Sequence, residues 1–254
     1  MSRYCLTAKM QTGSIVFLIS IYVCFGEGIS VKNVNDKLKY NDCDDVLRSG
    51  SYRESGNYVV FLNSSEPLQV YCNFESVEAR TPIMQQKYGR ENFQRYWHDY
   101  EYGFGNAASG DFWMGLKHMK RLTDTGFNVL TVTLQDCKNT IKVIRYNYFR
   151  LGPAYQRYPL RIGSYVSSSV LPDDFYHNNG MQFATIDRPD HHNCATHQRG
   201  GWWYNYCSFS LPTGRYYIGC YYKPSGGFYD GIYYKDWHGF GYSLKYIKME
   251  LSLY

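Results

Sequence analysis

The 254-residue chain lacks the compositional marks of several protein classes. It has no Gly-x-y period and no heptad run, which excludes a collagen or coiled-coil rod. It is not poor in aromatic residues, as disordered chains are, because Phe, Trp and Tyr make up 19% of it. Eight cysteines are too few for a knottin-like scaffold, but they can staple a globular domain. This length allows one large domain or two small ones.

The chain also has little excess charge of either sign, and it lacks several common enzyme motifs. The formal net charge is only +5, and the basic residues cluster at Lys117–Arg121 alone. That cluster is typical of a solvated helix face, so we predict no nucleic-acid partner. The chain has no Gly-x-Ser-x-Gly elbow, no His-Glu-x-x-His helix and no phosphate loop. These absences favour a binding protein over an enzyme.

The first 26 residues have the pattern of a secretory signal peptide. Arg3 and Lys9 form a basic start, an apolar run covers residues 14–25, and small residues precede a cleavage site before Glu27. The alternative is an uncleaved membrane anchor, which needs roughly 20 apolar residues. No other apolar run as long as residues 14–25 follows. We therefore predict a secreted, extracellular protein without a membrane span after signal removal.

Signal removal changes the cysteine and charge counts. Arg3 and Lys9 leave, so the net charge falls from +5 to +3. Cys5 and Cys24 leave too, and an even number remains, which in an oxidising compartment predicts three disulfides with fifteen conceivable pairings. The remaining cysteines are Cys43, Cys72, Cys137, Cys194, Cys207 and Cys220.

Hydrophobic periodicity predicts helices and strands in most of the chain, but not near its end. Residues 27–40 are a short polar leader. Helices are expected at 41–50, 91–101 and 115–122, and strands at 58–62, 68–72, 130–134, 142–151, 158–166 and 243–251. Between residues 172 and 242 the periodicity fails. So long an irregular stretch is uncommon in a compact domain, and function often resides in such loops.

A series of motifs lies in order along residues 41–254. The most specific is Gly-x-Trp-Trp at residues 200–203, which lies between Asn193-Cys194-Ala195 and Cys207. The others are Asp42-Cys43, Pro67-Leu-Gln-Val-Tyr-Cys72, Phe93-Gln-Arg-Tyr-Trp97, Tyr102-Gly-Phe-Gly-Asn106, Phe112-Trp-Met-Gly-Leu116, Leu122-Thr123 and Trp237-His-Gly239. With these motifs in this order, the chain resembles the fibrinogen C-terminal domain family.

The resemblance implies an α+β fold with three parts over residues 41–254. These are a small disulfide-stapled N-terminal unit, a central mixed or antiparallel sheet with helices, and a loop-rich C-terminal unit. It also implies the pairs Cys43–Cys72 and Cys194–Cys207. By elimination Cys137 pairs with Cys220, although one of these two cysteines could instead link subunits of a homo-oligomer.

Many family members hold calcium just before Asn-Cys-Ala, and the resemblance implies a site here. Its ligands would be Asp187, Asp190 and the carbonyl groups of His191 and Asn193, since calcium prefers oxygen ligands. Pro189 stands where the family's second acid is usual, and it could reshape the loop. The adjacent His191 and His192 do not suit zinc, because neighbouring side chains in an extended segment point in opposite directions.

The resemblance to secreted lectins of the ficolin and tachylectin type implies a pocket for acetylated sugars. It lies beside Cys194–Cys207 and includes an unusual peptide bond, Tyr206–Cys207, which would be cis. Ser208 stands where acetyl-binding members tend to carry His. An alternative is that the aromatic residues simply pack the loops. The other pocket residues implied are Phe228, Phe240, Tyr229, Tyr204 and Gln198.

The main functional hypothesis is therefore a secreted lectin-like protein that recognises acetylated groups on microbial or cell-surface glycans, with innate immunity as the setting by analogy. The alternative is a secreted ligand or adhesion protein that binds a cell-surface protein without binding sugar. Capture of a peptide N-terminus ranks lower, because Asp230 and Asp236 are the only acids near the pocket. A lectin with a single weak site would also need to self-associate. Asn63-Ser64-Ser65 predicts N-glycosylation at Asn63.

Overall fold

The computed structural model describes residues 39–50, 54–75, 78–167, 171–224 and 226–253. They belong to one compact unit, Lys39–Tyr254. The predicted signal peptide and leader residues 27–38 lie outside the described residues. Within the described ranges, no helix combines the length and the apolar character needed to cross a bilayer.

The N-terminal part is a short helix beside a two-stranded antiparallel sheet. The helix is α1 (Cys43–Arg48), and the strands are β1 (Gly56–Val60) and β2 (Leu68–Cys72). The helix begins where the sequence predicts, because the Asp42 carboxylate accepts the Asp45 amide at 2.8 Å. A disulfide joins α1 to the end of β2 through Cys43 and Cys72.

The main sheet has the strand order β4-β5-β3-β9-β6-β7-β8, with every neighbouring pair antiparallel. The C-terminal strand β9 lies between β3 and β6, so both of its edges are paired. Together with α1, this confirms the predicted α+β class. The strands are β3 (Thr81–Gln86), β4 (Phe104–Gly105), β5 (Phe112–Trp113), β6 (Val129–Gln135), β7 (Ile141–Leu151), β8 (Leu160–Ser167) and β9 (Tyr246–Ser252).

Two helices flank the sheet, and one of them is shorter than predicted. The helix α3 (Leu116–Asp124) buries Leu116, Met119 and Leu122. The helix expected at 91–101 is wrong in its first half, because α2 covers only Trp97–Tyr102. The Asn92 side chain accepts the Gln94 amide at 2.9 Å, and such a local side-chain bond competes with helix formation.

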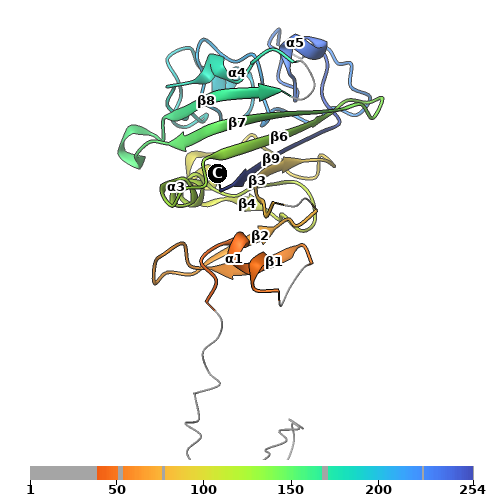
Figure 1. Ribbon diagram of the computed structural model, residues 1–254. Helices are drawn as coiled ribbons and strands as arrows, with labels where there is room; N and C mark the ends of the chain where they lie inside the picture. The colour runs from red at the N-terminus through yellow and green to blue at the C-terminus, as the bar shows by residue number, and fades with distance from the viewer. Residues whose placement is uncertain (1–38, 51–53, 76–77, 168–170, 225, 254) are drawn as a thin grey trace, which may run out of the picture. The chain divides into compact units, whose positions relative to one another are not determined.

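The segment from Leu171 to Lys245, here called the loop region, contains only short elements. They are η2 (Tyr176–Asn178), α4 (Cys194–His197) and α5 (Lys235–His238); a further 3-10 turn, η1 (Ala154–Gln156), precedes β8. Figure 1 shows α4 and α5 among these loops, on the β8 side of the sheet and away from β1 and β2. The irregular stretch predicted from the sequence therefore corresponds to a folded part of the unit.

Buried aromatic side chains join the loop region to the sheet. Trp203 is fully buried; its ring lies 6.2 Å from Trp113 and 4.9 Å from Phe183. The Trp203 indole N–H donates to the Tyr158 carbonyl at 2.7 Å. The Gly201 amide donates to the Tyr100 hydroxyl at 2.9 Å. Side chains thus supply hydrogen bonds that a strand ladder would otherwise provide.

Candidate binding surface

The Cys194–Cys207 disulfide joins α4 to a sharply turned segment, with the two Cα atoms 5.1 Å apart. Tyr206 and Cys207 both have left-handed backbone conformations, with φ of 46° and 67°. Such conformations are uncommon for residues other than glycine. The expected cis bond between them is wrong: none of the peptide bonds within the described ranges is cis. The unusual geometry here is instead a pair of consecutive left-handed residues.

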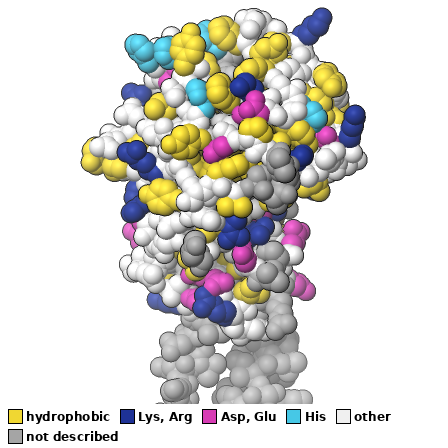
Figure 2. Space-filling view, turned by 45° about the horizontal axis from the view of Figure 1, so that its top comes forward, with side chains coloured by type: hydrophobic (Ala, Val, Ile, Leu, Met, Phe, Trp, Pro, Cys, Tyr) yellow, Lys and Arg dark blue, Asp and Glu magenta, His cyan; other side chains and the backbone are white. Residues whose placement is uncertain are grey.

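Exposed aromatic rings gather around this disulfide, each beside another ring. Tyr206 is 78% exposed, Phe228 45% and Tyr229 43%. The Tyr206 ring contacts the His192 ring at 4.6 Å, and Phe228 stacks on His197 at 4.0 Å. We call these five side chains the aromatic surface. Figure 2 shows hydrophobic and histidine side chains close together on this end of the molecule.

Several residues expected to line a sugar pocket lie below that surface. Ser208, Gln198 and Tyr204 are only 4%, 5% and 5% exposed. The Tyr233 hydroxyl accepts the Gln198 side-chain amide at 2.6 Å and lies 2.8 Å from the Ser208 hydroxyl. Burial raises the pKa of Tyr233 to about 12. These three predicted pocket residues are therefore buried, and hydrogen bonds inside the protein occupy their side-chain polar atoms.

The half-buried Phe240 completes the floor of the aromatic surface. It stacks with Tyr229 at 5.8 Å and meets Tyr233 edge-on at 5.2 Å. The main-chain N–H groups of Tyr206, Cys207 and Ser208 donate no hydrogen bond within the part of the chain that the structure describes. Exposed rings therefore lie next to free donors, a combination that suits a ligand with apolar and carbonyl groups.

The two acids of the predicted calcium site accept hydrogen bonds within the protein. The Asp190 carboxylate accepts the amides of His192, Cys194 and Ala195 at 2.9, 3.1 and 3.0 Å. The Asp187 carboxylate accepts the Trp97 amide at 2.8 Å and the Thr185 hydroxyl at 2.7 Å.

Calcium needs six to eight oxygen ligands. No group of three or more His, Cys, Asp or Glu residues among the described residues could hold a metal ion. The predicted calcium site has two acids and two main-chain carbonyl groups, so the absence of such a group does not test it, and it stays a prediction. A calcium titration remains the test of the predicted site.

The two acids near the aromatic surface are not free to bind a peptide N-terminus. Asp230 is 1% exposed; its carboxylate accepts the Tyr217 hydroxyl at 2.9 Å and lies 3.7 Å from the Arg199 guanidinium. Asp236 lies 3.4 Å from the Lys235 ammonium. The surface is thus aromatic and imidazole-rich rather than acidic.

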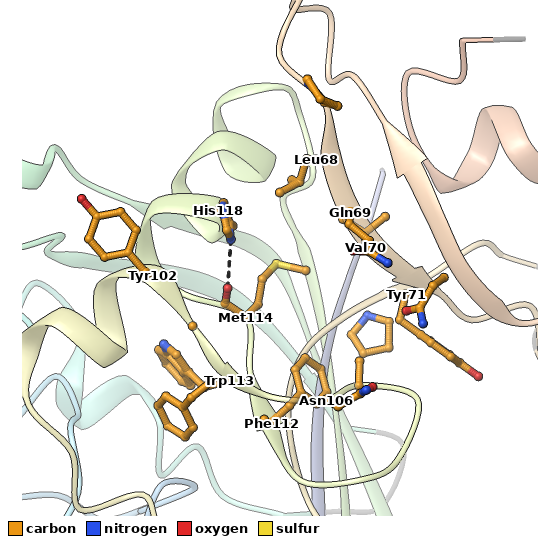
Figure 3. Close-up of a pocket in the computed structure, with 17 residues that line it drawn as sticks. Leu68, Gln69, Val70, Tyr71, Tyr102, Asn106, Phe112, Trp113, Met114 and His118 are labelled. Atoms are coloured by element: carbon orange, nitrogen blue, oxygen red, sulfur yellow. Dashed lines mark hydrogen bonds between the residues drawn. The ribbon is translucent and has the colours of Figure 1, made fainter. Parts of the chain in front are cut away.

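A cavity of about 500 Å³ lies between β2 and the β4–β5 edge of the main sheet. Figure 3 shows Leu68 and Val70 on one side, with Trp113, Met114 and His118 on the other. The His118 ring lies 3.0 Å from the Met114 carbonyl oxygen, and burial lowers the pKa of His118. No carboxylate, hydroxyl of Ser or Thr, or thiol lines this cavity. Its titratable side chains among the described residues are His118, Tyr71 and Tyr102.

The structure also describes the third predicted disulfide and the predicted glycosylation site. The structure pairs Cys137 with Cys220 within the chain, so none of the six cysteines among the described residues is left for a bond between subunits. Asn63 is exposed, in a turn after β1 with φ of 55°. Its exposure suits the predicted glycosylation, which stays a prediction.

The fold, the disulfides and the motif order together define an extracellular-type domain of one family. The model for "Fibrinogen beta and gamma chains, C-terminal globular domain" matches residues 39–254. The chain belongs to this family, which confirms the resemblance seen in the sequence.

Several relatives are similar over most of the chain. Fibrinogen-like protein 1 from Bos taurus is 33% identical over 211 residues, which cover 77% of this chain and 67% of that protein. Angiopoietin-related protein 2 from Homo sapiens is 36% identical over 189 residues, 72% of this chain and 38% of that protein.

Solved structures share the fold. The fibrinogen-like globe domain of human ANGPTL2 matches with a TM-score of 0.78 and 36% identity, over 84% of this chain and 99% of that one. Lamprey fibrin D-dimer, complexed with the peptide ligand Gly-His-Arg-Pro-amide, matches with a TM-score of 0.78 and 29% identity, over 85% and 74%.

Proposed function

We propose that this protein is a secreted, non-enzymatic ligand that binds a protein on cell surfaces through the aromatic surface. The observation that carries the proposal is the exposure of Tyr206, Phe228 and Tyr229 around a disulfide-held turn. Large rings that are exposed and held in place lose little entropy on binding, and aromatic residues are enriched in protein interfaces. The His192 ring, edge-on to Tyr206, and the His197 ring, stacked on Phe228, widen the contact area.

Three further observations support the proposal. The predicted signal peptide and the three disulfides suit an oxidising, extracellular setting. The related lamprey fibrin structure contains a bound peptide, so a peptide segment is a ligand for that relative. The acids near the surface here are buried or paired, which favours an apolar protein epitope over a charged N-terminus.

Recognition of an acetylated glycan is the second candidate function. The free amide groups of residues 206–208 favour it, because they could donate to an acetyl carbonyl beside the aromatic rings. The two candidates share a location but differ in their ligand. An experiment that removes protein and glycan separately can decide between them.

The test is binding of the fluorescently labelled full chain to cells of its source organism, measured by flow cytometry. The cells are used untreated, treated with protease, treated with glycosidases, or mixed with free N-acetylglucosamine. The proposal predicts saturable binding that protease abolishes and that the glycosidases and the sugar leave unchanged. Loss with glycosidases or the sugar supports the glycan candidate. Absence of saturable binding to any cell type contradicts both candidates.

A further inference from the structure

A second cavity is lined by arginine side chains. It has a volume of about 460 Å³ and lies between residues 86–94 and residues 199–216. Ligand sites in proteins commonly have volumes of about 300–1,000 Å³. Arg90, Arg199 and Arg215 line it, with Glu91 as its only acid. We call it the arginine pocket.

The acids around the arginine pocket are already occupied. The Glu91 carboxylate lies 2.9 Å from the Arg95 guanidinium, outside the lining. Arg199 faces the buried carboxylate of Asp230 at 3.7 Å. Each of these two pairs has a net charge close to zero. Neither pair therefore adds to or cancels the positive charge of Arg90 and Arg215.

The neighbouring Asp111 is buried and bound to the main chain. Its carboxylate accepts the amides of Lys87, Tyr88 and Arg90 at 2.5, 2.9 and 2.6 Å. It makes no ion pair with a guanidinium. In the part of the chain that the structure describes, Arg90 and Arg215 lie within 4.0 Å of no carboxylate. Two uncompensated positive charges therefore flank one cavity.

Both uncompensated guanidinium groups lie over aromatic rings. Arg90 lies 4.8 Å from the centroid of the Tyr88 ring, and Arg215 lies 5.3 Å from that of Tyr217. A cation over a ring face is attracted by the ring quadrupole, which limits where the side chain can move. The planar guanidinium then presents its N–H donors in a fixed fork, which matches oxyanions bidentately.

The rest of the lining suits a sugar more than an acidic peptide. Asn92 and Gln94 are exposed and bring side-chain amides that can hydrogen-bond to hydroxyl groups. The Tyr216 ring packs under Gly89, where an added Cβ would lie 2.7 Å from it, and it presents an aromatic wall to the cavity. The guanidinium groups suit oxyanions, and the side-chain amides and the Tyr216 ring suit a sugar. Together they match a saccharide that carries oxyanions.

We propose that the arginine pocket binds sulfated polysaccharide of the kind found on extracellular matrix and cell surfaces. Arg90 and Arg215 would hold sulfate groups, while the amides and the tyrosine ring contact the sugar. This site takes a different ligand from the aromatic surface. Binding there would retain the secreted chain near the cells that carry its protein partner.

The test is surface plasmon resonance of the full chain on an immobilised heparin-derived hexasaccharide. Because a charge-assisted hydrogen-bonding group is worth roughly a tenfold change in affinity or more, Arg90→Ala and Arg215→Ala should each weaken binding about tenfold. The double variant should weaken it about 100-fold if the two sites act independently. The affinity of Arg215→Lys should lie between those of the native chain and Arg215→Ala, because lysine keeps the positive charge but loses the forked arrangement of N–H donors.

Arg161→Ala is the matched control, because it removes the same charge from an exposed position on β8. It and Tyr206→Ala should bind the hexasaccharide like the native chain. Binding should also weaken as salt is added, through charge screening. The proposal is overturned if the double variant binds like Arg161→Ala, if a desulfated hexasaccharide binds equally well, or if a poly-glutamate peptide binds more tightly than the sulfated sugar.

Discussion

The main sheet and the loop region are two parts of one domain that are stabilised in different ways. In the sheet, Val129 to Gln135 face partners on β9, and most of them face partners on β7 as well. The backbone N–H and C=O groups of these strands therefore hydrogen-bond to one another. In the loop region, long segments have no strand neighbour, and disulfides and buried side chains hold the backbone instead.

This difference explains where a binding surface can form. A strand fixes alternate side chains on two faces, so it has little freedom to cluster exposed rings. The loop region can hold consecutive left-handed residues such as Tyr206 and Cys207, because a disulfide and a buried network enforce them. The sheet acts as a platform, and the loop region presents the side chains.

We expect the largest loss of stability when Trp203, which packs between the loop region and the sheet, is removed. Trp203→Ala leaves a cavity between the two parts and removes the donor to the Tyr158 carbonyl. We expect a loss of about 3–5 kcal/mol in the free energy of unfolding, measured by denaturant titration. Tyr155→Ala, at an 85% exposed position, is the control and should change little. A loss below about 1 kcal/mol for Trp203→Ala would mean that Trp203 does not couple the two parts.

Removing the Cys194–Cys207 disulfide should loosen the loop region alone. The double variant Cys194→Ser/Cys207→Ser should lose roughly 3 kcal/mol, because the short loop is no longer closed in the unfolded chain. Hydrogen exchange should speed up for amides of residues 194–208 and stay slow in β6 and β9. Equal acceleration in the sheet and the loops would show that the two parts unfold as one.

Asp190 should stabilise the loop region through hydrogen bonds to α4 rather than through a metal. Asp190→Ala removes the carboxylate that accepts three amides, and the loss of hydrogen bonds to a charged group should lower the free energy of unfolding by about 1.5–3 kcal/mol. Added calcium should leave the melting temperature of the native chain unchanged. A rise with calcium that Asp190→Ala abolishes would instead reveal an ion site, since a ligand of the folded state stabilises it.

A buried acid in the loop region should make the stability depend on pH. Burial raises the pKa of Asp174 to about 7, while the Asp236 amide that donates to it at 2.8 Å opposes the shift. The folded state then binds this proton more tightly than the unfolded state, whose carboxyl has the ordinary value of 3.8. The contribution to stability is therefore full below that value and falls as the pH rises toward about 7.

Asp174→Asn removes this pH dependence, because an amide does not titrate. The free energy of unfolding of the native chain, relative to that of Asp174→Asn, should fall between about pH 4 and about pH 7. The check is a series of denaturant titrations across that range. A constant difference between the two proteins would contradict the shifted pKa.

Much of the sheet could be predicted from sequence, because its residues alternate between two faces. Leu130, Val132 and Leu134 are all buried, as the period-two pattern indicates. The family motifs also gave two of the three disulfides, and elimination gave the third, Cys137–Cys220. The start of α2 could not be found this way, because the Asp187 carboxylate that accepts the Trp97 amide lies ninety residues away.

The candidate surface was only partly predictable for the same reason. The resemblance named Tyr206, Phe228 and Tyr229, but not the histidine rings beside them, because His192 and His197 meet their partners only in the folded chain. It also placed Ser208, Gln198 and Tyr204 at or near the pocket. Ser208 and Gln198 are buried and bonded to the Tyr233 hydroxyl, which no local pattern singles out. The arginine pocket likewise joins segments that are far apart in sequence.

The measurement that tests the account most directly compares two exposed tyrosines, one from each part. Tyr206 lies in the loop region and is 78% exposed, while Tyr148 lies on β7 and is 43% exposed. Because a central aromatic contact often carries 2 kcal/mol or more, Tyr206→Ala should weaken cell binding by about tenfold or more. Tyr148→Ala should bind like the native chain. Equal binding by both variants, or a loss with Tyr148→Ala alone, would contradict the claim that the loop region presents the binding surface.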